Sequence, residues 1–124
     1  MKKLLIAMVL LATGSAWAEW VKVGETDDAN IYIDPASIRK DGNLRRVWQI
    51  QDLKQRDKEG GEMSRRVRKE YDCKQERHRN LSFSTHSEPM AGGKTLVSGG
   101  EETKWRDTPP DSAAEAIQKL VCAN

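Results

Sequence analysis

The sequence contains few of the residues from which catalytic and metal sites are built. Its 124 residues include only two cysteines and two histidines. These four residues lack the paired spacing of a zinc site, and no nucleophile-elbow or metalloprotease helix motif occurs. His78 and His86 are each expected to be exposed and inert. We therefore predict no catalytic residues, no metal site and no cofactor, and we predict that the protein is not an enzyme.

Long hydrophobic runs are equally scarce. The only such run, residues 4–12, follows a basic start and is too short to cross a bilayer, which takes about 20 residues. The Ala-Trp-Ala sequence at 16–18 has the small-x-small form of a signal-peptidase site. We predict that residues 1–18 are a signal peptide cleaved after Ala18. Residues 19–124 would then form a single domain without a transmembrane segment.

An excess of one charge sign is also lacking. Without the first 18 residues, 106 residues remain with 19 basic and 19 acidic side chains, so the formal charge is zero. This balance excludes a globally basic nucleic-acid binder. Glu19 stands where a bacterial lipoprotein has its anchor cysteine. We therefore expect an exported protein that is periplasmic, secreted or at the cell surface, without a lipid anchor.

The two cysteines, Cys73 and Cys122, form an even pair in a chain with an export signal. Such a pair predicts a disulfide. The bridge would close a loop of 50 residues, for which loop-closure entropy is worth about 4 kcal/mol.

Alternation of polar and apolar residues predicts an antiparallel sheet. In the alternating segment 44–53 the face carrying Trp48 and Ile50 is predicted to point to the core. Leu81 and Phe83 are also predicted to point inward. With a single Phe in the chain, the tryptophans are expected to form the bulk of the core. The predicted strands cover residues 20–23, 31–33, 44–53, 63–73, 79–85 and 95–97, with a last short strand near Trp105.

The C-terminal segment has a helical pattern instead. Ser112 and Glu115 have the spacing of a capping box. An apolar stripe follows, made of Ala113, Ala116, Ile117, Leu120 and Val121. The predicted fold is therefore α+β, an antiparallel sheet of about six strands with one C-terminal helix packed on it. The predicted disulfide would tether this helix to the sheet.

An ordered set of residues runs through the whole predicted domain. It consists of Trp20, Tyr32-Ile33-Asp34, Ser37-Ile38, Val47-Trp48, Tyr71-Asp72-Cys73, Trp105, Pro110, Ser112 and Val121-Cys122. This set resembles the surface-adhesin protein E family of Gram-negative bacteria. The resemblance implies a curved sheet of about six antiparallel strands with a disulfide-tethered helix. It also implies a surface protein that binds host matrix or serum components, including vitronectin and laminin.

Charge is concentrated in the middle of the chain. Residues 39–79 carry 14 basic and 8 acidic side chains, whereas both flanking segments are net acidic. Guanidinium groups suit sulfate, phosphate and carboxylate, so this segment predicts an acidic partner. The other interpretation is a solvated sheet face whose charge prevents aggregation. The candidate binding residues are Arg45, Arg65, Arg66, Arg68, Lys69 and Arg79.

Two functions are compatible with these observations. The first is a non-enzymatic, adhesin-like binding protein whose partner is a matrix protein or an acidic polymer. The second is a soluble periplasmic accessory protein, either an envelope structural partner or an enzyme inhibitor. A monomer or weak dimer is expected in both cases.

Overall fold

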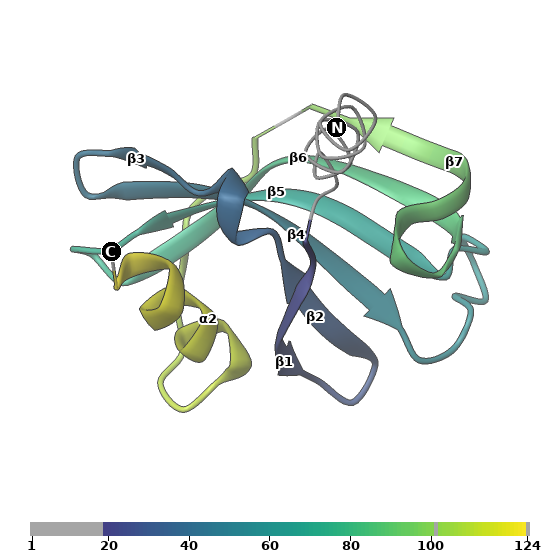
Figure 1. Cartoon of the computed structure of the whole chain (residues 1–124), viewed down its shortest axis with the longest axis horizontal. Helices are drawn as coiled ribbons and strands as arrows, with labels where there is room; N and C mark the ends of the chain where they lie inside the picture. Colours follow the sequence, from purple (N-terminus) through teal and green to yellow (C-terminus); the bar gives the residue numbers. More distant parts are fainter. Residues whose placement is uncertain (1–18, 101, 124) are drawn as a thin grey trace, which may run out of the picture.

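The structure is a computed structural model that describes residues 19–100 and 102–123. The predicted signal peptide lies outside the described residues. Within them, two short 3-10 helices interrupt a series of β-strands, and one α-helix, α2, follows the last strand (Figure 1). The elements are β1 (Val21–Glu25), β2 (Ala29–Ile33), η1 (Pro35–Ser37), β3 (Arg39–Asp41), β4 (Leu44–Leu53), β5 (Ser64–Asp72), β6 (Arg77–Glu88), η2 (Pro89–Ala91), β7 (Gly92–Gly99), β8 (Arg106–Asp107) and α2 (Ala113–Cys122).

All strand pairs are antiparallel and belong to one sheet. The main path runs β1-β2-β4-β5-β6-β7, with β3 beside β4 and β8 beside β6. Helix α2 packs near the β1 end, and β7 lies at the opposite end (Figure 1). This arrangement confirms the predicted α+β fold, with six strands in the main path and one C-terminal helix.

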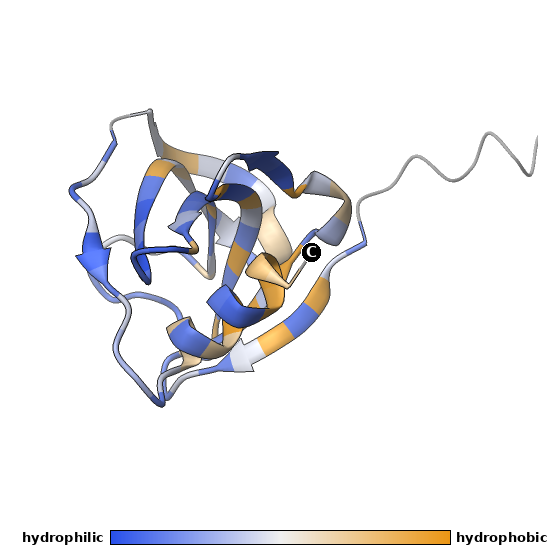
Figure 2. Ribbon diagram, turned by 90° about the vertical axis from the view of Figure 1, so that its left-hand side faces the viewer, coloured by the Kyte–Doolittle hydropathy of each residue, from blue (hydrophilic) through white to orange (hydrophobic). Residues whose placement is uncertain are grey.

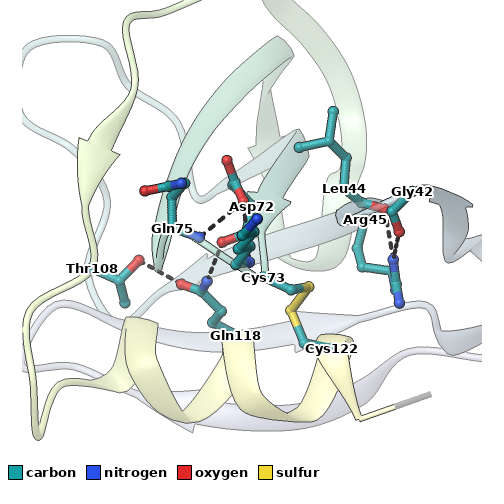
Figure 3. The surroundings of a disulfide bond; sticks show 10 residues. Gly42, Leu44, Arg45, Asp72, Cys73, Gln75, Thr108, Gln118 and Cys122 are labelled. Carbon is teal, nitrogen blue, oxygen red and sulfur yellow. Dashed lines mark hydrogen bonds between the residues drawn. A yellow bond between two sulfur atoms is a disulfide. The ribbon is translucent and has the colours of Figure 1, made fainter.

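The disulfide joins Cys73, directly after β5, to Cys122 at the end of α2 (Figure 3). It confirms the predicted pairing. Beside it, the side-chain amide of Gln118 on α2 donates a hydrogen bond of 2.9 Å to the backbone carbonyl of Asp72. The disulfide and this hydrogen bond therefore attach α2 to the end of β5.

The N-terminus of α2 is capped as its sequence predicts. The Ser112 hydroxyl accepts a hydrogen bond from the backbone N–H of Glu115 at 3.1 Å. The Glu115 carboxylate accepts one in return from the backbone N–H of Asp111, one residue earlier than in the standard capping box. These bonds satisfy N–H groups that the first helical turn leaves without partners.

The hydrophobic core lies between α2 and one face of the sheet, which we call the helix face. Figure 2 shows apolar ribbon segments gathering where α2 meets the strands. At its centre the Tyr71 hydroxyl donates a hydrogen bond to the side-chain oxygen of buried Gln49. The core residues are Ile31, Ile33, Val47, Tyr71, Ile117 and Val121.

The prediction that the Trp48–Ile50 face points to this core is wrong. Val47, only 1% exposed, lies in the core, and the side chains of Trp48 and Ile50 point to the opposite face because neighbouring residues in a strand alternate. Ile50 is nevertheless fully buried. The sheet is covered on both faces at this point, so alternation alone could not identify the helix face.

A segment around η2 covers the end of this second face. The backbone N–H of Met90 donates to the Asp52 carboxylate at 2.8 Å, and that of Ala91 donates to the Ser64 hydroxyl at 2.8 Å. Ser64 is fully buried and donates in turn to the carbonyl of Glu88. Met90 and Ala91 both have positive φ angles, which are unfavourable for residues with a Cβ. Their conformation is therefore held by these bonds.

Phe83 is also placed differently from the prediction. Its register with Val67 places it on the helix face, but its side chain is 40% exposed, because α2 packs mainly on β1, β4 and β5. Phe83 pairs with Gly99 on β7, and a Cβ at Gly99 would lie 2.8 Å from the Phe83 ring. The ring therefore covers a glycine in the edge strand instead of filling the core.

The two histidines are more enclosed than expected. His86 is 8% exposed. His78 is half-buried, and its Nδ1 lies 3.0 Å from the Thr108 hydroxyl. That hydroxyl donates to the Gln118 side chain, so Nδ1–H of His78 must be the donor to Thr108. Burial, together with the charges of Lys69 and Arg106, lowers the pKa of His78 to about 4.

We predict that His78 makes the folded protein less stable in mild acid. The unfolded chain binds a proton at His78 near pH 6.5, but the folded protein binds it only near pH 4. The free energy of unfolding should therefore fall as the pH is lowered through this window. Urea denaturation of wild type and His78→Gln between pH 7 and 4 should give a shallower fall for the variant. Because other titrating groups are shared, parallel curves would contradict the assignment.

Candidate binding face

The strand register gathers arginines on the sheet face opposite α2. Arg46 on β4 lies opposite Glu70 on β5, which lies opposite Arg79 on β6. Arg66 and Arg68 project from β5 to the same side, because their positions differ from that of Glu70 by even numbers. We call the face defined by Arg46, Arg66, Arg68 and Arg79 the arginine face.

Arg66 is held on this face by an aromatic ring. Its guanidinium carbon lies 4.3 Å from the centroid of the Trp48 ring, which is cation–π geometry. Within the described residues, the Nε of Arg66 is buried and has no hydrogen-bond partner. Stacking on Trp48, and not a carboxylate, therefore positions this cation.

Glu70 is the buried centre of the arginine face. Its side chain is 1% exposed, and its two oxygens accept hydrogen bonds of 2.8 Å from the Nε atoms of Arg46 and Arg79. The hydrogen bond with Glu70 raises the pKa of Arg46. A buried carboxylate needs such partners because it has left water. Two guanidinium groups are thus fixed around one carboxylate.

Trp105 extends the stacking along the face. The guanidinium carbons of Arg77 and Arg79 lie 4.6 and 4.4 Å from the centroid of its ring. Trp20, Trp48 and Trp105 are all half-buried, and none belongs to the core cluster. The prediction that the tryptophans form the bulk of the core is therefore wrong. Trp48 and Trp105 instead give arginine side chains an apolar surface to lie on.

Arg68 differs from its neighbours on the arginine face. The ion pairs here belong to Arg46, with Glu70 and Asp41, and to Arg79, with Glu70 and Glu102. In the described part of the chain Arg68 has no ion pair or hydrogen bond from its side chain. It is half-buried and lines a surface pocket. Its five donors are therefore available to a ligand.

The other three candidate residues lie on the helix face. Arg45 donates hydrogen bonds to the carbonyls of Gly42 and Leu44 (Figure 3). Arg65 pairs with Glu62 at 2.9 Å. Burial and the charge of Arg106 lower the pKa of Lys69 to about 8. The structure thus separates the six candidates into Arg66, Arg68 and Arg79 on one face and Arg45, Arg65 and Lys69 on the other.

Arg46 is the member of the face that sequence reasoning missed. It lies on the same face of β4 as Trp48 and Ile50, and that face was predicted to point to the core. The sequence signal that could have identified it is Glu70, an acidic residue that follows the basic residues of the same strand. A carboxylate that becomes buried in a sheet needs a cation beside it, and in the structure Arg46 is one of its partners.

The guanidinium groups of the arginine face are suited to contacts with oxyanions. In residues 19–100 and 102–123, no three His, Cys, Asp or Glu side chains are grouped so that they could hold a metal ion. Among the described helices, none has the length and apolarity that crossing a membrane requires.

Fold and site together define a class, namely small antiparallel-sheet domains with a disulfide-tethered C-terminal helix and a charged open face. The sequence profile described as surface-adhesin protein E matches residues 20–123. The chain therefore belongs to the surface-adhesin protein E family, which confirms the resemblance seen in the sequence. The comparison with curated protein sequences finds no matching relative.

Solved structures of Haemophilus influenzae protein E share this fold. Crystal form II has a TM-score of 0.66 at 14% identity, and the match covers 88% of this chain and 91% of that chain. A further structure of the protein gives 0.64 at 16% identity, covering 88% and 87%. Protein E from non-typeable Haemophilus influenzae gives 0.59 at 18% identity, covering 87% and 86%. At such low identity the likeness shows the fold alone.

We predict that Glu70→Gln destabilises the protein by about 2 kcal/mol. The change removes the charge that compensates two partly buried guanidinium groups, and a full loss of 3–5 kcal/mol is reduced by their remaining contact with water. Glu102→Gln is the matched control, because Glu102 contacts the same Arg79 but is 60% exposed. It should change stability by less than about 0.5 kcal/mol. Urea denaturation measures both, and equal effects would contradict a central role for Glu70.

Proposed function

We propose that this chain is an exported, non-enzymatic binding protein of the adhesin type whose arginine face recognises an acidic polymer. The observation that carries the proposal is Arg68, a half-buried guanidinium without an ionic partner in the described residues, placed between stacked Arg66 and paired Arg46. Guanidinium groups pair bidentately with sulfate and carboxylate. Membership of a family of surface adhesins supports a partner outside the cell.

The position of the face in the sheet favours a glycan over a peptide. The arginine face spans β4, β5 and β6, whose backbone groups are used in ladders with neighbours on both sides. An extended peptide gains much of its affinity by pairing with a free sheet edge, and this face offers none. The ligand must be read by side chains alone. A sulfated or carboxylated glycan of the extracellular matrix fits that requirement.

The second candidate is a periplasmic accessory protein. The observation that favours it is that Arg46, Arg66 and Arg79 already have partners inside the molecule. In this alternative the arginines cover the second sheet face, and the partner is another envelope component.

We expect charge reversal on the arginine face to abolish heparin binding. Arg66→Glu/Arg68→Glu places two carboxylates where guanidiniums would meet sulfate, so retention on a heparin column at low salt should be lost. The matched control is Lys58→Glu/Lys74→Glu, which changes the net charge equally at exposed positions outside the face. It should retain most of the binding. Equal retention of the first variant and wild type would contradict the proposal.

Folding of the charge-reversed protein has to be verified, because Arg66 is stacked on Trp48. Arg68→Glu alone avoids that contact and should still weaken binding by about tenfold. Its circular dichroism spectrum and midpoint of urea denaturation should match those of the wild type.

The location of the protein separates the two candidates. We expect protease added to intact cells to cleave a protein displayed on the surface, whereas an accessory protein in the periplasm should be cleaved only after the outer membrane is permeabilised. Immunoblotting of the native protein, with a known periplasmic protein as control, gives the result. Protection on intact cells would contradict binding to host matrix and leave the accessory function.

A further inference from the structure

A shallow pocket opens on the arginine face next to Arg68. Its volume is about 410 Å³. The lining contains three guanidinium groups and two carboxylates, so its formal charge is +1. An oxyanion entering it would meet more positive than negative charge. The lining residues are Arg46, Arg68, Glu70, Arg79, Leu81, Ser82, Gly100 and Glu102.

The two carboxylates of the pocket are held very differently. Glu70 is 1% exposed and is bonded through both oxygens, so it is part of the fold. Glu102 lies between β7 and β8 and is 60% exposed. Its single ion pair among the described residues joins its Oε2 to Nη1 of Arg79 at 3.4 Å. Such an exposed pair is worth only about 0.2–1 kcal/mol, so a ligand can replace it.

We propose that this pocket binds the oxyanion group of the acidic ligand, with Arg68 as the main contact, and that Glu102 competes for Arg79 when the pocket is empty. The proposal rests on the proposed function and adds its site and its internal competitor. A sulfate or carboxylate on Arg68 would replace the Glu102 carboxylate at Arg79, and the Ser82 hydroxyl lines the same pocket as a further donor.

The competition follows from charge and position. With Glu102 on Arg79, the pocket has one net positive charge. When Glu102 moves into solvent, the net charge becomes +2 while Glu70 stays in place. The affinity for an oxyanion therefore depends on a carboxylate that belongs to the chain itself.

The test uses the whole mature protein and a sulfated heparin disaccharide, with affinities measured by calorimetry. Glu102→Gln should tighten binding about two- to fivefold, because the competing ion pair is lost. Arg68→Gln should weaken it at least about tenfold. Arg68→Lys keeps the charge but not the bidentate geometry, and it should give an intermediate loss.

Glu59→Gln is the matched control for Glu102→Gln. Glu59 is exposed in the loop between β4 and β5 and does not line this pocket, and the substitution changes the net charge equally. Equal tightening by both variants would show an effect of net charge only and would overturn the role of Glu102. Unchanged affinity in Arg68→Gln, with folding verified by circular dichroism, would overturn the site.

A second probe identifies the oxyanion. In a desulfated disaccharide the uronate carboxylate is the one anionic group that remains. Binding of both probes supports a site for either group, and binding of only the sulfated probe supports a sulfate site. If the wild-type protein binds heparin but neither disaccharide, the assignment of this pocket as the binding site is overturned and the proposed function stands. If the wild-type protein binds neither heparin nor the disaccharides, the proposed function is overturned as well.

Discussion

The ten-residue helix α2 can cover only one of the two faces of the sheet. Helix α2 buries an apolar surface against β1, β4 and β5 and so covers the helix face over these strands. No second helix in the described residues covers the other face. That face is instead closed by guanidinium groups lying on tryptophan rings, by a buried carboxylate between two arginines, and by η2. The placement of charge in the molecule follows from this shortage of apolar cover.

Arginine is suited to this task because its side chain is both apolar and ionic. The planar guanidinium stacks on Trp48 or Trp105 while its edges still donate hydrogen bonds. Lysine could not reproduce both contacts. The stacked and paired arginines therefore cover the face, whereas Arg68 has no ion pair in the described residues. In the function that we propose, the same residue type would provide both cover and recognition, and the presence or absence of a partner within the protein would separate the two roles.

The sequence predicts the elements of this fold well, because local signals determine them. The N-terminal cap of α2 and the strand alternation are properties of residues close together in the sequence. It does not predict which face of β4 receives the helix. Val47 and Ile50 are both buried on opposite faces, so the pattern supports either choice. That error also left Arg46 out of the candidate residues. The exposure of Phe83 was missed because how far α2 reaches across the sheet is not a local property of the sequence.

The candidate site was only half predictable for a related reason. A basic segment in a strand alternates its cations between two faces, so a run of arginines is never one patch. The separation of Arg65 from Arg66 follows from alternation alone. The ionic state of each cation depends on strands far apart in sequence, as the pairing of Arg46 with Glu70 shows. The burial of Glu70 could not be predicted from the sequence, because most of the residues around it in β5 are also charged.

The segment at η2 links parts of the chain that are far apart in sequence. Met90 and Ala91 are held in an unfavourable backbone conformation by bonds to Asp52 and Ser64. Loss of either acceptor would leave that conformation without compensation. The residues tolerated at positions 52 and 64 therefore depend on the backbone of η2, so substitutions in these three places should not have independent effects on stability.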